Sequence, residues 1–142
     1  MRKAYIPQPV RREVLQRAKE RCEYCLSRSD LLGAELEIEH IIPESLGGTS
    51  SFDNLCASCA TCNRHKGSRI REMDAETGQN VRLFHPRRQR WNRHFRWSQD
   101  GVQIIGKTKC GRATVKALQM NRQRLVRARR LWVTWSEHPP PA

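Results

Sequence analysis

Four cysteines in two Cys-x-x-Cys pairs constrain this chain more than any other feature of its sequence. Cys22 and Cys25 form the first pair, and Cys59 and Cys62 form the second. Each pair supplies two thiolates from one tight turn, and Zn²⁺ prefers four such ligands in a tetrahedron. The sequence therefore predicts a structural zinc site that joins two distant segments. Because four protein thiolates leave no open coordination position, we expect this zinc to take no part in catalysis.

The alternative for these cysteines is disulfides or unrelated buried thiols. Disulfides are rare in a reducing cytosol, and the stretch from Met1 to Pro7 lacks the apolar core of a signal peptide. We therefore predict a cytoplasmic protein with a metal site rather than disulfides. Cys56 and Cys110 fit no ligand spacing, and we interpret them as ordinary small buried residues.

The charge of the chain predicts its partner. Lys and Arg number 27 against 14 Asp and Glu, which gives a formal net charge of +13 over 142 residues. A polyanion that meets such a surface gains free energy from counterion release, so nucleic acid is the predicted partner. No apolar run approaches the ~20 residues that a membrane-spanning helix needs, so no membrane is expected.

Residue patterns predict a small α+β domain built around a ββα unit. Polar and apolar residues alternate from Glu35 to Ile41, which predicts a half-buried strand with Glu37 and Glu39 on its outer face and His40 at its end. The other elements of this half are expected as an N-terminal helix, a loop, a return strand and a second helix, over residues 9–20, 43–53, 54–57 and 60–73. In the loop, Gly47 and Gly48 allow another backbone to come close.

The second half is predicted to be a basic, aromatic-rich extension that packs on the core. Residues 74–80 are typical of a linker, so the chain divides into a helix and core at 1–73 and an extension at 74–142. Asp100-Gly101 between alternating runs predicts a hairpin, and a basic helix is expected over residues 121–135. Its arginines are expected to be exposed. Its large apolar residues are expected to be buried: Leu125, Val126, Leu131, Trp132 and Trp135.

A second set of polar residues lies between and after the cysteine pairs. Glu39 and His40 place a carboxylate beside an imidazole, and Asn63 follows the last cysteine pair directly. Hydrolysis of a phosphodiester needs a base to deprotonate water and a hard cation to stabilise the leaving oxygen. Neutral histidine is such a base, and a carboxylate with an amide suits Mg²⁺. By themselves these residues fit a surface strand with a stray Glu-His pair equally well.

The order of these residues resembles the HNH endonuclease family, of the His-Me finger or ββα-metal class. The resemblance spans Cys22 to Gly67 and consists of Cys-x-x-Cys, Glu-His-Ile-x-Pro, Gly-Gly, Asn-Leu and Cys-x-x-Cys-Asn-x-x-Lys in this order. It implies a zinc-stapled ββα-metal fold and a metal-dependent endonuclease that cleaves DNA, with duplex DNA favoured. The second half is similar to an extension on some free-standing bacterial members, which implies a bacterial intracellular protein. One centre per chain implies nicking by a monomer or double-strand cutting by a homodimer.

The resemblance also implies roles for single residues. His40 corresponds to the general base and Asn54 to the residue that braces the loop, while Glu39 and Asn63 correspond to ligands of a catalytic Mg²⁺ or Mn²⁺. Glu39 is one methylene longer than the usual Asp, and Asn63 replaces a final histidine, which favours Mg²⁺ or Mn²⁺ over Zn²⁺. Basic residues are expected to contact nucleic acid: Arg64, His65, Lys66, Arg87, Arg88, Arg90 and Arg93. His65 has a second interpretation as an exposed helix residue.

Two alternative functions are compatible with the same residues. A catalytically inactive, zinc-dependent nucleic-acid-binding module would keep the zinc and the charge but cleave nothing. An HNH nuclease acting on RNA would keep the chemistry and change the substrate. All three proteins would bind nucleic acid in a salt-sensitive manner, so cleavage assays are needed to separate them.

Overall fold

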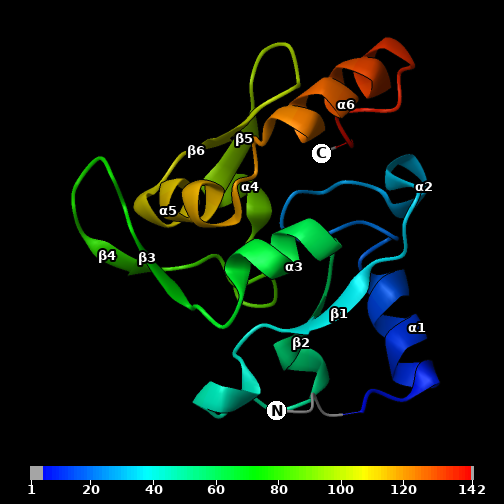
Figure 1. Ribbon diagram of the computed structural model, residues 1–142, viewed down its shortest axis with the longest axis vertical. Coiled ribbons are helices and arrows are strands. Elements are labelled where there is room, and N and C mark those ends of the chain that lie inside the picture. The colour runs from blue at the N-terminus through cyan, green and yellow to red at the C-terminus, as the bar shows by residue number, and fades with distance from the viewer. Residues whose placement is uncertain (1–4, 142) are drawn as a thin grey trace. The chain divides into compact units, whose positions relative to one another are not determined.

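The computed structural model describes residues 5–141 as a succession of short helices and strands (Figure 1). The chain divides into two compact units. The first comprises the described residues up to Ile70 together with His85–Arg88, and the second comprises Arg71–Phe84 and the described residues from Gln89 onward. Within the described part of the chain, no helix is both long enough and apolar enough to span a membrane.

Helix α1 (Gln8–Arg17) opens the first unit. Pro9 lies in its first turn, where the missing amide hydrogen costs no hydrogen bond. The helix packs against strand β2 (Leu55–Ser58). The predicted N-terminal helix is therefore confirmed, although it stops at Arg17. It stops there because Lys19 and Glu20, with φ of 55° and 57°, turn the chain toward the first cysteine pair.

A ββα unit forms the centre of the first unit. Strand β1 (Glu37–His40) pairs antiparallel with β2, with Glu39 opposite Cys56. Helix α3 (Ala60–Lys66) follows β2 and packs against β1. This arrangement confirms the predicted ββα unit and the α+β fold class.

Short helices occupy the connections of the first unit. Helix α2 (Ser29–Leu32) precedes β1, and the 3-10 turns η1 (Glu44–Leu46) and η2 (Phe52–Asn54) lie in the loop between the strands. Helix α3 is shorter than the predicted helix over residues 60–73. The reason is Gly67, whose φ of 56° and ψ of −136° end the helix in a conformation that residues with a side chain rarely adopt.

The second unit contains two antiparallel hairpins and two longer helices. Its elements follow one another as β3 (Arg71–Met73), β4 (Asn80–Arg82), α4 (Trp91–His94), β5 (Phe95–Trp97), β6 (Ile104–Gly106), α5 (Lys109–Leu118) and α6 (Gln123–Thr134). Strand β3 pairs with β4, β5 pairs with β6, and α5 packs against β3, β4 and β6. The predicted hairpin through Asp100 and Gly101 is confirmed by the pairing of β5 with β6.

The prediction of a linker over residues 74–80 is wrong, because these residues form the turn of the β3–β4 hairpin. Asp74 is fully buried there and accepts hydrogen bonds from Nε and Nη2 of Arg112 at 3.0 and 2.9 Å. The hydroxyl of Thr77 donates a third, at 2.8 Å. Polar turn residues have the composition of a linker, and the arginine that fixes them is 38 residues away in sequence.

In and directly after helix α6, the burial of three residues is the reverse of the prediction. Arg129, expected to be exposed, is fully buried, and its guanidinium donates to the carbonyl oxygens of Val102 at 3.0 Å and Met120 at 2.8 Å. Leu131 and Trp135, expected to be buried, are 54% and 60% exposed. The inner face of the helix is thus held partly by an arginine, and its outer face carries two large apolar side chains.

Candidate active site

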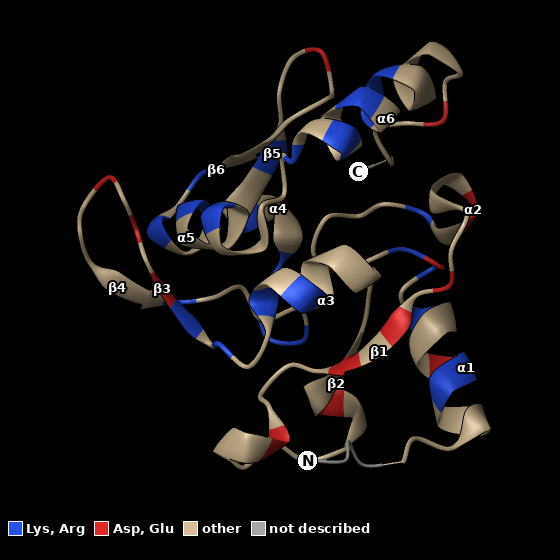
Figure 2. Cartoon of the chain, viewed as in Figure 1, with Lys and Arg blue, Asp and Glu red and all other residues tan. Residues whose placement is uncertain are grey.

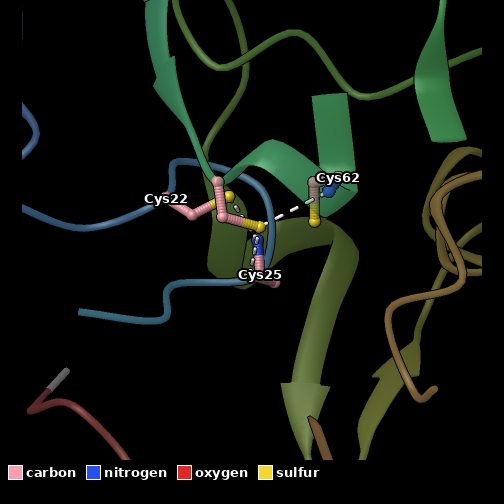
Figure 3. Close-up of side chains that lie close together, drawn as sticks. Cys22, Cys25 and Cys62 are labelled. Carbon is pink, nitrogen blue, oxygen red and sulfur yellow. Dashed lines mark hydrogen bonds between the residues drawn. The ribbon is translucent and has the colours of Figure 1, made fainter. Parts of the chain in front are cut away.

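The four predicted zinc ligands come together in the first unit. The Sγ atoms of Cys22, Cys25, Cys59 and Cys62 all lie within 4.8 Å of one another, and all four side chains are buried. Figure 3 shows three of them with their sulfur atoms turned toward one another. Zn–S bonds of about 2.3 Å place tetrahedral sulfurs about 3.8 Å apart, and Sγ of Cys25 lies 3.8 Å from Sγ of Cys59. This set of donors fits a structural Zn²⁺.

Backbone amides hold the sulfur atoms in place. The amide of Cys25 donates to Sγ of Cys22 at 3.5 Å, and the amide of Cys62 donates to Sγ of Cys59 at 3.4 Å. Cys59 is also the N-cap residue of α3, so its sulfur accepts the helix's own amide. Hydrogen bonds from the other cysteines, Cys22 first, lower the pKa of Cys25 well below its usual value. Cys25 is thus favoured as a thiolate, the form that binds metal, whereas burial raises the pKa of Cys22 above its usual value.

The first cysteine pair docks on strand β2 through Glu23. The amide of Glu23 donates to the carbonyl of Ala57 at 2.9 Å, and the amide of Ala57 donates to the Glu23 carboxylate at 2.8 Å. The same carboxylate forms an ion pair with Arg87. Arg87 was expected to contact nucleic acid, and in this structure it has a protein partner.

Asn54 fixes the loop between the strands. Its Oδ1 accepts from the amide of Ile42 at 2.8 Å, and its Nδ2 donates to the carbonyls of Ile42 at 3.0 Å and Thr49 at 2.7 Å. Gly48 lies against the same backbone, because a Cβ placed on it would be 1.7 Å from the carbonyl oxygen of Ile42. The loop after His40 is thereby pinned at both ends.

One pocket brings together the three residues on which the predicted chemistry depends. Glu39, His40 and Asn63 all line a cavity of about 570 Å³ in the first unit. Two further carboxylates, those of Glu37 and Glu44, line it as well. The sequence analysis placed Glu37 on the same strand face as Glu39, but it named neither Glu37 nor Glu44 as part of the site. Carboxylate and amide oxygens around one cavity are suited to a hard divalent cation.

His40 is held at the edge of this pocket. The side chain is 9% exposed, and its Nε2 lies 2.9 Å from the hydroxyl of Ser50 and 3.6 Å from the carboxylate of Glu44. Ser50 lies in the loop that Asn54 fixes. Two contacts therefore orient the ring, and the sequence pattern predicted neither of them. The contact with Glu44 had a possible signal in the sequence, because Glu44 follows His40 by four residues.

Glu39 is enclosed, contrary to the prediction of an outward face. It is 4% exposed, because Tyr24 from the first cysteine pair and Lys66 from α3 cover this face of the hairpin. Its Oε2 accepts from the thiol of Cys56 at 3.3 Å. Burial, followed by the nearby Cys56 and Glu39, raises the pKa of Tyr24 well above its usual value. Among the described residues, Oε1 of Glu39 has no hydrogen-bond partner, although it is buried.

The two α3 residues at the helix's last turns differ in their surroundings. Asn63 is half-buried, and its Nδ2 donates to the carboxylate of Glu37 at 2.6 Å. Lys66 is 1% exposed, and its ammonium donates to the carbonyl of Ile41 at 2.9 Å and lies 3.1 Å from Glu39. The ammonium of Lys66 therefore points at the carboxylate of Glu39 and not at the solvent. A phosphate approaching from solvent does not reach it in this structure, contrary to the predicted contact with nucleic acid.

The remaining basic residues that were expected to contact nucleic acid lie at the surface to different degrees. Arg64 is exposed and lines the pocket, whereas His65 is half-buried and outside its lining. Arg88 is exposed in the first unit, and Arg90 and Arg93 are exposed in the second. Their contact with nucleic acid stays a prediction.

The first unit has the fold of the ββα-metal class. An antiparallel hairpin with a histidine at the end of its first strand is followed by a helix, and the buried cluster of four cysteines is consistent with a zinc site. Residues 22–69, about a third of the chain, match the HNH endonuclease family. The family predicted from the order of the motifs is confirmed. The chain is also 35% identical over 69 residues to the type IV methyl-directed restriction enzyme EcoKMcrA of Escherichia coli K12. That similarity covers 45% of this chain and 25% of the relative, so only about a quarter of the relative's length is matched.

Proposed function

We propose that this protein is a metal-dependent endonuclease that hydrolyses phosphodiester bonds of DNA with His40 as the general base. The observation that carries the proposal is the shared pocket of Glu39, His40 and Asn63 beside the ββα unit. The family match of residues 22–69 supports the same reaction class.

In this proposal His40 accepts a proton from a water molecule as the water oxygen attacks phosphorus. The bond to the 3′ oxygen breaks, and that oxygen takes a proton from solvent, which leaves 5′-phosphate and 3′-hydroxyl ends. Ser50 and Glu44 orient the imidazole, and Asn54 holds the loop that carries Ser50. A base held in one orientation needs no reorganisation before the reaction.

Glu39 and Asn63 are the proposed ligands of a catalytic Mg²⁺ or Mn²⁺. The buried Oε1 of Glu39 is a donor atom of the right kind, and in this structure its partner is the ammonium of Lys66, 3.1 Å away. Glu37 lines the same pocket and bonds to Asn63, so it is a further candidate. When bound, such a cation stabilises negative charge on the leaving oxygen.

Duplex DNA is the proposed substrate. The similar protein EcoKMcrA is a methyl-directed restriction enzyme, and restriction acts on DNA. The net charge of +13 favours a polyanion but does not distinguish DNA from RNA. Competition between duplex DNA and a structured RNA in the cleavage assay tests this choice.

The enclosure of Glu39 favours one second candidate, a nucleic-acid-binding module without cleavage. Its carboxylate already has an ammonium 3.1 Å away. If that ion pair excludes a cation, the pocket binds no catalytic metal. The two candidates differ in cleavage and not in binding.

Incubation of supercoiled plasmid with Mg²⁺ or Mn²⁺ tests the proposal. The wild type is expected to produce nicked or linear DNA, with linear product indicating a homodimer or successive nicks. His40→Ala is expected to lower the rate at least ~100-fold, the lower end of general-base contributions. His65→Ala is the matched loss of an imidazole on α3 outside the pocket lining. Because His65 is itself predicted to contact nucleic acid, a small effect there measures binding, and only His40→Ala is expected to abolish the chemistry. Intact plasmid with the folded, zinc-loaded wild type would support the second candidate instead.

A further inference from the structure

The excess positive charge of this protein is concentrated in its second unit. By sequence, the second unit carries 14 Lys and Arg against five Asp and Glu, whereas the first carries 13 against nine. The candidate active site lies in the first unit. The charge that favours a polyanion is therefore mostly outside the unit that holds the site.

Helix α6 is the strongest example of this charge. Its twelve residues include four arginines and no Asp or Glu, and Figure 2 shows basic segments along it with no acidic one. Arg129 is buried and holds the helix to its unit through Val102 and Met120. Arg130 lies 3.8 Å from Asp100. Arg124 and Arg127 are exposed and form no ion pair with any described carboxylate.

Four of the exposed residues on or directly after α6 form one stripe, which we call the α6 outer face: Arg124, Arg127, Leu131 and Trp135. They follow one another at intervals of three or four residues, the spacing of neighbours on one side of a helix. Trp135 directly follows the helix, and its amide donates to the carbonyl of Leu131 at 3.0 Å, so the helical spacing extends to it.

The apolar half of the α6 outer face is unusual for a solvent-exposed helix. Leu131 is 54% exposed and Trp135 is 60% exposed, whereas Trp132 on the inner face is 4% exposed. An exposed tryptophan on the same helix face as two arginines places an apolar surface in line with phosphate ligands. A parallel pairing of this face with that of a second copy would set arginines opposite arginines, which opposes a dimer of that geometry.

We infer that the α6 outer face binds nucleic acid at a surface separate from the candidate active site. Arg124 and Arg127 contact phosphates, and Trp135 packs against a sugar of the backbone. The inference rests on the proposed function in one respect: the nucleic acid that binds this face is taken to be the proposed substrate, DNA. It assigns to the second unit a role in holding the substrate rather than in chemistry.

The test measures binding of a labelled DNA duplex to the full chain by fluorescence anisotropy at several salt concentrations. All variants carry His40→Ala, so that cleavage does not interfere. The double variant Arg124→Gln with Arg127→Gln is compared with Arg82→Gln with Arg96→Gln, which removes the same charge from two other exposed arginines of the second unit. Each lost phosphate contact lowers the slope of log affinity against log salt by about 0.9.

The α6 double variant is therefore expected to lose about 1.8 from the salt slope, while the control pair keeps it. Trp135→Ala is expected to weaken binding about fivefold or more through the loss of its apolar contact with the backbone sugar, and Trp135→Phe is expected to restore most of it. Equal losses in the α6 and control pairs would mean that only net charge matters and would overturn the inference.

Two further outcomes distinguish this inference from a protein interface on the same face and from the proposed function. If Trp135→Ala dissociates a dimer in sedimentation and leaves DNA affinity unchanged, the α6 outer face is a protein interface and the inference fails. If the wild type cleaves no DNA but the α6 variants still lose affinity selectively, the proposed function fails and the inference stands. Melting temperatures equal to that of the His40→Ala parent show that the loss arises at the surface, since the side chains substituted in addition to His40 are all exposed.

Discussion

The ammonium of Lys66 lies 3.1 Å from Oε1 of Glu39, and the two side chains are 2% and 5% exposed. The carboxylate proposed to hold the catalytic cation therefore has a counter-ion built into α3. Lys66 is anchored independently by the carbonyl of Ile41 at 2.9 Å. Taking either charge away leaves the other buried without its partner, which is costly. The pair thus links the stability of the first unit to the occupancy of the pocket.

Lys66→Met is expected to lower the free energy of unfolding by about 3–5 kcal/mol, because Glu39 is left as an unpaired buried charge. A divalent cation that binds Glu39 replaces the lost positive charge. Mn²⁺ is therefore expected to raise the melting temperature of Lys66→Met by more than that of the wild type. Thermal unfolding in increasing Mn²⁺ measures both effects. The control is Lys66→Met combined with Glu39→Gln, which has no unpaired charge and is expected to lose the Mn²⁺ effect; equal Mn²⁺ shifts in all three proteins would contradict the prediction.

The elements that the sequence predicted best are those set by short spacings. Both cysteine pairs, the strand that ends at His40 and the hairpin at Asp100 depend on residues that are close in the chain. The burial of Glu39 depends instead on what covers the strand, namely Tyr24 and Lys66. The alternation of polar and apolar residues along one strand cannot predict this burial, because the alternation does not show which other segments cover the strand.

The burial of Arg129 could have been predicted from the sequence. Leu125, Arg129 and Trp132 are spaced by four and three residues, so they lie on one face of a helix. Arg129 was placed outside because of its charge, although its position lies on the apolar stripe. Its guanidinium is satisfied by carbonyl oxygens from elsewhere in the second unit, and those contacts are not visible in a local pattern.

Gly48→Ala is expected to destabilise the protein and abolish cleavage, because its Cβ would lie 1.7 Å from the carbonyl oxygen of Ile42. The loop that carries Ser50 would have to move. Gly78→Ala is the matched control. Gly78 has a φ of +74° but open space around it, so the cost is backbone strain of about 1 kcal/mol. Chemical unfolding and plasmid cleavage report the two effects, and a Gly48→Ala protein as active as Gly78→Ala would be evidence against a fixed loop.

Removal of zinc is expected to unfold the first unit. The four buried thiols have only one another and nearby polar groups as partners without the metal, and structural zinc contributes directly to folding. Metal analysis should find one tightly bound zinc per chain, and Cys22→Ser should lower the melting temperature and the zinc content together. Cys110→Ser is the matched control, since Cys110 is half-buried and outside the cluster. A Cys22→Ser protein that melts like Cys110→Ser would exclude a structural metal here.

The second unit is expected to lose stability in acid through Asp74. Hydrogen bonds from Arg112, the largest cause, hold the pKa of Asp74 well below its usual value. A carboxyl group whose pKa is lowered in the folded protein stabilises it above the unfolded pKa of about 3.9, and this stabilisation is lost as the pH falls toward the folded value. Asp74→Asn should therefore be less stable than wild type near neutral pH, and the difference should shrink as the pH drops below about 4.

The measurement is chemical unfolding of both proteins across this pH range, followed by tryptophan fluorescence, because all four tryptophans lie in the second unit. Asp53→Asn serves as the comparison, since it removes an exposed carboxylate from the first unit. It is expected to leave the pH dependence of that fluorescence transition unchanged. A gap between wild type and Asp74→Asn that stays constant down to low pH would show that Arg112 does not need a charged partner.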